Sequence, residues 1–200
     1  MKIKNLTPNS DVYTSNVYLV TGTNNTLPDV NTLIDVGRDP KILDTLPNES
    51  TGVGKRAVEQ VIITHNHYDH TGMLKAIIDR YHPRVYAFSP NLSGVDFLLR
   101  DEEEISIGDR YFEVIHIPGH SSDSICLFCK EDGALFAGDT PVIIRFAGDT
   151  YSAAFISGLE RICRKNVRTI YFGHGTEKTE GCNQALAESL LRVRESTIIP

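Results

Sequence analysis

The sequence predicts an α/β fold, because short strand-like segments alternate with helix-like segments along the chain. Apolar runs bounded by glycine, proline or asparagine recur throughout and are typical of buried strands. Two later segments carry apolar residues at helical spacing. The 200 residues are 40% hydrophobic and 23% charged, which is ordinary for a globular protein with one sizeable core. We therefore expect a single domain over residues 1–200.

The strands and helices are expected in an alternating order. Residues 12–20 and 30–35 form the first two predicted strands, joined through a Thr-Gly-Thr-Asn-Asn segment. The later predicted strands occupy 61–64, 84–88, 124–129, 134–137 and 169–172, with a hairpin over 105–114 around Gly108-Asp109. Helices are expected at 38–46, at 71–80 before Pro83, over 155–163 and over 187–193.

Four side chains that can bind metal lie within six residues, directly after the apolar run 61–64. They are His65, His67, Asp69 and His70. Imidazole and carboxylate are common ligands of zinc and of non-haem iron. Because a tight loop after a strand can turn alternate residues toward one centre, we expect His65 and His67 to share a metal ion. Asp69 and His70 then face a neighbouring position.

Three further apolar strands are each followed by a glycine and a candidate ligand. The pairs are Gly119-His120, Gly138-Asp139 and Gly173-His174. A glycine at such a turn lets the backbone pass close to a bound group. The chain therefore offers seven candidate ligands, which are too many for one tetrahedral ion and suit two. They are His65, His67, Asp69, His70, His120, Asp139 and His174.

The simplest division gives each metal ion three ligands and one shared carboxylate. His65, His67 and His120 hold one ion, and Asp69, His70 and His174 hold the other. Asp139 bridges, because the two oxygens of a carboxylate can span ions about 3.5–4 Å apart. Room remains for a shared solvent molecule, which is typical of catalytic sites. We expect two divalent ions, zinc first, although these ligands also accept iron and manganese.

The ligand motifs resemble those of the metallo-β-lactamase superfamily in order and spacing. They read T-H-N-H-Y-D-H-T-G (64–72), P-G-H-S-S-D-S (118–124), F-A-G-D-T-P (136–141) and Y-F-G-H-G (171–175). Residues 16–20 and 32–37 also resemble the two opening strands of that family. The resemblance extends from about residue 12 to about residue 178 and implies a four-layered αββα sandwich.

The resemblance is strongest to glyoxalase II and related thioesterases, lactonases and persulfide dioxygenases. His67 stands where flavodiiron-type oxidoreductases usually carry glutamate, and Asp139 stands where the commonest β-lactamases place cysteine. Glyoxalase II carries a helical C-terminal domain that helps bind glutathione. About two dozen residues follow His174 here, so we expect no glutathione site of the usual kind.

The function that the resemblance implies is metal-dependent hydrolysis. A metal-bridged hydroxide would attack the carbonyl of a small thioester, lactone or ester, with Asp69 orienting the water as well as binding metal. A mononuclear iron persulfide dioxygenase is the second reading, in which Asp139 and the first histidine set hold the iron. The third is a metal-bound binding or sensor domain without efficient turnover.

Substrate contacts are expected around the metal rim. Tyr68 lies inside the metal loop, and Arg145 and Tyr151 follow Asp139. Arginine favours planar anions such as carboxylates, so Arg145 is a candidate anion contact. Lys55 and Arg56 offer a second one.

Charge and cysteine content narrow the remaining expectations. A net charge of -6 argues against nucleic-acid partners, so the expected partner is a small molecule. The N-terminal residues contain no apolar stretch of signal-peptide length and no segment suits a membrane span, so the expected location is cytoplasmic. Cys126 and Cys129 are three apart on a strand and point to opposite faces, which favours buried structural thiols. Cys163 fits a helix stripe, and Cys182 is expected to be exposed at the start of the last helix.

Overall fold

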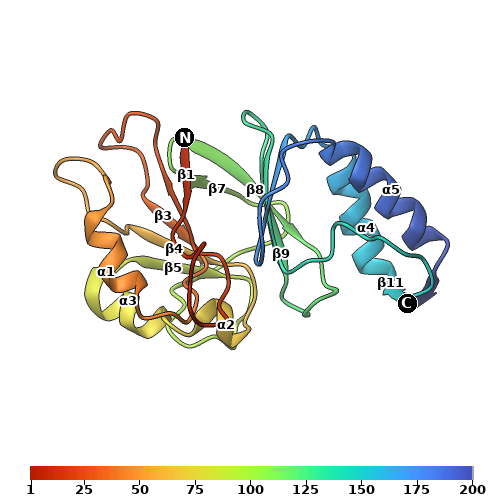
Figure 1. Cartoon of the computed structure of the whole chain (residues 1–200), viewed down its shortest axis with the longest axis horizontal. Coiled ribbons are helices and arrows are strands. Elements are labelled where there is room, and N and C mark those ends of the chain that lie inside the picture. Colours follow the sequence, from red (N-terminus) through yellow and green to blue (C-terminus); the bar gives the residue numbers. More distant parts are fainter. Residues whose placement is uncertain (200) are drawn as a thin grey trace.

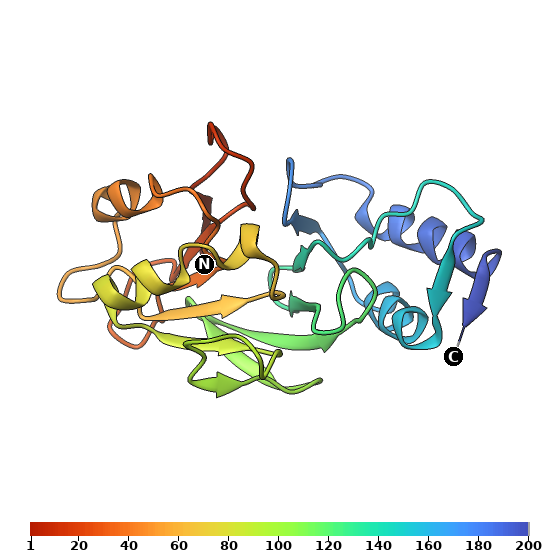
Figure 2. The same cartoon turned by 90° about the horizontal axis from the view of Figure 1, so that it is seen from below.

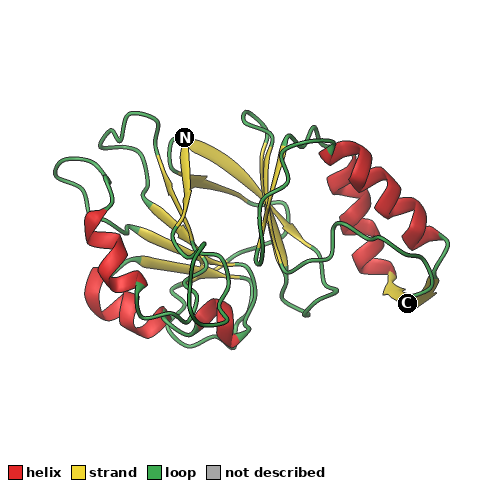
Figure 3. Ribbon diagram, in the orientation of Figure 1, coloured by secondary structure: helices red, strands yellow, loops and turns green. Residues whose placement is uncertain are grey.

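Two β-sheets lie face to face and carry helices on their outer faces in the computed structural model, which describes residues 1–199 (Figure 1). Helices α1 and α3 cover one sheet, and α4 and α5 cover the other, as Figure 2 shows from below. Figure 3 separates the layers by secondary structure. The layer order is therefore helix, sheet, sheet, helix.

The first sheet is mixed. Its strands lie in chain order: β1 (Lys2–Asn5), β2 (Tyr18–Thr21), β3 (Thr32–Ile34), β4 (Gln60–Ile63), β5 (Arg84–Ala87) and β6 (Phe97–Leu98). The pairs β1–β2 and β2–β3 are antiparallel, whereas β3 to β6 run parallel. The parallel strands direct their carboxyl ends, including that of β4, to one edge of the sheet.

The second sheet has the order β12 (Thr169–Phe172), β10 (Ala134–Gly138), β9 (Ile125–Cys129), β8 (Arg110–His116) and β7 (Glu104–Ile107). Only β10 and β12 pair in parallel, so both deliver the residues that follow them to the same edge. A small parallel pair joins β11 (Thr150–Ser152) to β13 (Thr197–Ile199). The outer helices are α4 (Ala153–Cys163) and α5 (Cys182–Arg194).

Three apolar cores hold the four layers together. In β4, Val61 and Ile63 pack toward the helices of the first half, and Ile62 packs between the sheets. Phe136 of β10 joins that central core, whereas Leu135 joins the outer core that contains Phe155 of α4. This alternation is what a strand buried on both faces requires. The prediction of an αββα sandwich is confirmed.

Several element boundaries differ from the predictions. The predicted helix 38–46 is reduced to α1 (Ile42–Thr45) and a 3-10 turn (Leu46–Asn48), because Pro40 precedes the first turn and Pro47 lacks an amide donor. The predicted helix 71–80 is two helices, α2 (Tyr68–Thr71) and α3 (Leu74–Tyr81). The predicted strand 12–20 is extended β only from Tyr18.

Residues 12–17 do not join a sheet. They pass alongside α2 and the loop that follows β12. The amide of Ser15 donates to the carbonyl of Asp69 at 3.0 Å, and that of Asn16 donates to the carbonyl of Gly173 at 2.6 Å. These bonds tie the start of the chain to helix α2 and to the loop after β12. Tertiary contacts therefore replace the strand pairing that the apolar pattern suggested.

The cysteines differ in outcome. Cys126 and Cys129 are buried in cores on opposite faces of β9, as predicted. The exposure predicted for Cys182 is wrong: this first residue of α5 is buried, and its thiol lies within hydrogen-bond distance of the carbonyls of Arg168 and Lys178. No helix of the described residues is long and apolar enough to cross a membrane.

Candidate metal centre

Three histidines from two loops form the first ligand set. His65 lies two residues after the end of β4, His67 precedes α2 in an extended conformation, and His120 lies in the loop after β8. Nδ1 of His67 is 3.1 Å from Nε2 of His65 and 2.9 Å from Nε2 of His120. The three ligand nitrogens lie within 4.8 Å of one another. This spacing suits a shared ion better than three packed side chains.

Two carboxylates and two histidines form the second set. Asp69 and His70 come from α2, Asp139 follows β10 and His174 follows β12. Nε2 of His174 is 3.0 Å from Oδ2 of Asp69, and Nε2 of His70 is 3.3 Å from Oδ1 of Asp139. These four ligand atoms also lie within 4.8 Å of one another.

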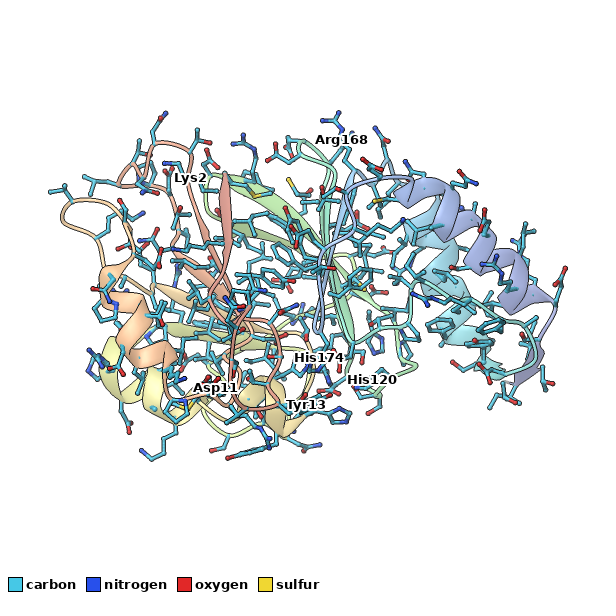
Figure 4. The ribbon with its side chains drawn as sticks, in the orientation of Figure 1. Lys2, Asp11, Tyr13, His120, Arg168 and His174 are labelled. Carbon is cyan, nitrogen blue, oxygen red and sulfur yellow. The ribbon has the colours of Figure 1, made fainter. Side chains whose placement is uncertain are left out.

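Asp139 connects the two sets. Its Oδ2 lies 3.5 Å from Nε2 of His120 in the first set and 3.4 Å from Nε2 of His174 in the second. The structure therefore brings all seven sequence-predicted ligands together, in the division expected from the sequence. His120 and His174 lie at the lower edge of the sandwich in Figure 4, between the two sheets.

The donor atoms fit metal cations. Nε2 of His70 and Oδ1 of Asp139 are buried and have no hydrogen-bond partner, although buried polar atoms are normally paired. Burial opposes charge on both groups, yet each stabilises the other: the pKa of His70 is raised by the carboxylates of Asp35 and Asp139, and the pKa of Asp139 is lowered by His70. The negative potential that favours a proton at His70 favours a metal cation there too.

Asp35 fixes the orientation of a histidine in each set. Its Oδ2 accepts from Nδ1 of His70 at 2.8 Å, so that nitrogen carries the proton and Nε2 keeps its lone pair for a metal. The hydroxyl of Thr64 donates to the same Oδ2 at 2.8 Å and has only one hydrogen. It must therefore accept from Nδ1 of His65, 3.2 Å away, which leaves Nε2 of His65 free for the first set.

Asp35 is a site residue that no sequence motif predicted. It is buried and has a φ of +58°, a left-handed conformation that aspartate and asparagine tolerate better than most residues. Its place directly after an apolar strand was the available signal. No spacing rule connects it to His70, because the two meet only through the pairing of β3 with β4.

Close backbone approach needs glycine at two of the ligand loops. A Cβ at Gly138 would lie 2.8 Å from the Thr64 hydroxyl, and Gly138 itself has a φ of +52°. A Cβ at Gly173 would lie 2.0 Å from Oδ1 of Asp139. The glycines that precede Asp139 and His174 therefore let the second sheet deliver its ligands into the centre.

Tyr13 covers the outer side of the second set and was also missed. Its ring stacks on that of His174, with centroids 4.9 Å apart, and its hydroxyl lies 3.4 Å from Nε2 of His174. Arg38 donates to the Tyr13 carbonyl and holds this loop in place. Figure 4 shows Tyr13 beside His174. Tyr13 falls within the predicted strand 12–20, and no sequence pattern connected it to His174.

The residues predicted to bind substrate occupy different positions. Tyr68 is exposed on α2, and Arg145 is exposed in the loop between β10 and β11. Tyr151 lines a cavity of about 530 Å³ together with His120. Lys55 donates to backbone carbonyls of Thr26 and Asp29, and Arg56 donates to that of His82. These bonds give both cations a structural role in their loop.

The chain is similar to curated hydroxyacylglutathione hydrolases over part of its length. The hydroxyacylglutathione hydrolase of Chromohalobacter salexigens is 33% identical over 110 residues, which are 54% of this chain and 41% of that protein. The hydroxyacylglutathione hydrolase of Francisella tularensis is 38% identical over 88 residues, 43% of this chain and 35% of that protein. The similarity thus spans less than half the length of these curated relatives.

Solved structures agree in fold. BLEG-1 B3 metallo-beta-lactamase superposes with a TM-score of 0.66 at 22% identity, covering 92% of this chain and 96% of its own. ETHE1 from Myxococcus xanthus superposes with a TM-score of 0.67 at 20% identity, covering 96% of this chain and 83% of its own. The family model of the metallo-beta-lactamase superfamily matches residues 10–174. Because that match takes in all seven candidate ligands and most of the sandwich, the chain belongs to the metallo-beta-lactamase superfamily.

Proposed function

We propose that this protein is a hydrolase that uses two divalent metal ions to cleave a small thioester. Zinc is the metal that we propose. The observation that carries the proposal is the position of Asp139, whose Oδ2 lies within 3.5 Å of a histidine nitrogen from each ligand set. One carboxylate between two open ligand sets is what a binuclear hydrolytic centre requires. The curated relatives are named hydroxyacylglutathione hydrolases, which supports hydrolysis as the reaction class.

A small-molecule substrate is part of the proposal. Cavities of about 300 Å³ and 530 Å³ adjoin His120, and sites of this size hold small ligands. The net charge of -6 disfavours a nucleic-acid substrate.

The residues of the centre would divide the work of hydrolysis. When bound, the two ions supply hydroxide near neutral pH and polarise a carbonyl oxygen. Asp35 keeps His65 and His70 in the tautomers that bind metal. Asp69 reaches His174 through one carboxylate oxygen, and in our proposal its carboxylate also orients the attacking water by accepting a hydrogen bond.

Hydrolytic activity is expected to depend on bound metal. Protein purified without added metal is expected to contain about two zinc ions per chain by elemental analysis and to hydrolyse thioesters. Chelation is expected to lower kcat/KM by about a thousandfold, the equivalent of about 4 kcal/mol of transition-state stabilisation, and zinc should restore it. Because metal binds the folded state, chelation should also lower the Tm.

Three results would contradict the hydrolase. One iron per chain, with oxygen uptake on a persulfide, would indicate the dioxygenase instead. Two bound metals without turnover of any thioester, lactone or ester would indicate a binding domain. Protein that cannot be loaded with metal would remove the basis of the proposal.

Tyr13→Phe is expected to lower kcat about tenfold and to leave KM and metal content nearly unchanged. The hydroxyl lies beside the metal-binding nitrogen of His174, where a neutral O–H can donate to the oxyanion that forms from the substrate. Phenylalanine keeps the stacked ring. The effect is smaller than for a buried oxyanion donor because the Tyr13 side chain is 68% exposed.

The matched control is Tyr111→Phe, which removes the hydroxyl of another exposed tyrosine on β8, outside the centre. Steady-state kinetics on both variants, with zinc measured in each, separates the roles. A rise in KM alone, or loss of zinc from Tyr13→Phe, would show that Tyr13 binds substrate or supports metal rather than the transition state.

A further inference from the structure

The cavity of about 530 Å³ beside His120 has an apolar and aromatic wall. Phe155 of α4 and Tyr151 of β11 stack with centroids 5.2 Å apart, and Ile199 of β13 forms part of the same lining. The parallel pairing of Tyr151 with Ile198 and of Ser152 with Ile199 holds that wall together. An aromatic pair with a branched aliphatic side chain binds apolar groups by removing their surface from water.

This cavity adjoins the metal centre. His120 and Pro141 line it, and both also line the neighbouring cavity of about 300 Å³ that contains Asp139 and His174. A carbonyl placed at the ligand sets would therefore direct one of its two substituents along the Tyr151–Phe155 wall.

Cationic side chains are missing from the linings. Among the described residues, neither of these two cavities is lined by a lysine or an arginine. The cavity on the other side of the centre, which includes Tyr13 and Gly175, has Glu177 as its one charged lining residue among those described. A substrate carboxylate would meet no lysine or arginine among the described lining residues of these three cavities.

Two arginines of neighbouring segments are held by backbone carbonyls. Arg192 donates to the carbonyl of Ile144, and Arg38 donates to that of Tyr13. Arg145 is exposed outside the lining. The carboxylate of Asp149, which accepts a hydrogen bond from the Tyr151 hydroxyl at 3.4 Å, adds negative charge near the aromatic wall. Desolvating an anion there without a partner would cost binding energy.

We propose, on the basis of the hydrolase function above, that the substrate is an uncharged thioester whose apolar acyl group packs against Tyr151, Phe155 and Ile199. An aromatic or branched acyl group fits this wall, whereas an acyl group with a carboxylate does not. A leaving group with carboxylates, such as glutathione, is likewise disfavoured.

Three synthetic thioesters test the proposal on the zinc-loaded full chain. Phenylacetyl-N-acetylcysteamine is uncharged, succinyl-N-acetylcysteamine carries the charge on its acyl group, and phenylacetyl-glutathione carries it on the leaving group. We expect kcat/KM for the first to exceed that for each of the others by about 30-fold, a typical discrimination by an apolar pocket. Equal or faster turnover of the succinyl thioester would overturn the proposal.

A pair of variants on one strand locates the effect. Ile199→Lys places a cation in the wall and is expected to lower the preference for phenylacetyl over succinyl about tenfold, mainly through KM. Ile198→Lys is the matched control, because Ile198 is the adjacent residue of β13, is similarly exposed and does not line the cavity. Equal effects of the two substitutions would overturn the assignment of the wall.

Binding of unreactive analogues separates this proposal from the hydrolase itself. Calorimetry with the amide analogues of the phenylacetyl and succinyl thioesters should give tighter binding of the phenylacetyl compound. If this preference appears but no thioester is cleaved, the hydrolase is wrong and the apolar cavity stands. If thioesters are cleaved and the succinyl analogue binds as tightly, the hydrolase stands and the cavity proposal is wrong.

Discussion

Replacing Asp35 with asparagine is expected to weaken metal binding at both ligand sets by about 10- to 100-fold, the usual cost of losing such a supporting carboxylate. Asparagine offers one acceptor oxygen and one donor amide, whereas the aspartate accepts from the Thr64 amide, the Thr64 hydroxyl and His70. The asparagine amide group then faces at least one of these three donors, which cannot accept from it in its present state. The tautomers of His65 and His70 are therefore no longer fixed. Asparagine tolerates the left-handed φ of this position, so backbone strain does not obscure the result.

Zinc titration followed by calorimetry or elemental analysis measures the effect of Asp35→Asn. The control is Asp29→Asn, which removes a buried carboxylate that accepts from the Thr26 amide and hydroxyl, both at 2.7 Å, and contacts no ligand histidine. Both variants should lose some thermal stability, but only Asp35→Asn should lose zinc affinity. Unchanged zinc affinity at both sets would show that Asp35 stabilises the fold and does not contribute to metal binding.

Gly173→Ala is expected to lower kcat/KM by about 100-fold, because small displacements of catalytic groups have effects of this size. The added methyl group would lie 2.0 Å from Oδ1 of Asp139 and 2.8 Å from Cε1 of His70, so at least one ligand must move. Asp139 is the residue that connects the two sets. We therefore expect the zinc content to fall from about two ions per chain toward one.

The control for general loop damage is Gly175→Ala. Gly175 has a φ of +78°, so alanine there strains the backbone, but its methyl group would have no neighbour within 4 Å. Zinc content and kinetics of the two variants, measured with the Tm of each, distinguish strain from a steric conflict with the ligands. Equal losses in both would attribute the effect to the loop and remove Gly173 from the account of the centre.

Three of the metal ligands could be predicted from the sequence because each lies one or two residues after an apolar strand. The carboxyl ends of β4, β10 and β12 meet at one edge, and a residue one or two positions after such a strand is placed by the sheet rather than by its own loop. His65, Asp139 and His174 are in this class. A local pattern, an apolar strand followed by a ligand residue, therefore predicted which distant residues meet in the structure.

Other features depended on contacts that no local pattern encodes. Strand β1 (Lys2–Asn5) alternates lysine with other residues at the sheet edge and gave no buried-strand signal. Strand β13 is exposed and is ordered by its pairing with β11, so its part in the cavity wall required the three-dimensional structure. Tyr13 reaches His174 across 161 positions of chain.

The division of the ligands between the two halves of the chain has a consequence for how the protein folds. Four ligands precede residue 71 and three follow residue 119, so each set contains residues that are far apart in sequence. Contacts of this kind form late, because the loop between them must close first. A metal ion that binds both halves therefore stabilises the docked sandwich rather than either half alone. Refolding in the presence of a chelator should then accumulate chains with formed strands and helices whose two sheets have not yet associated.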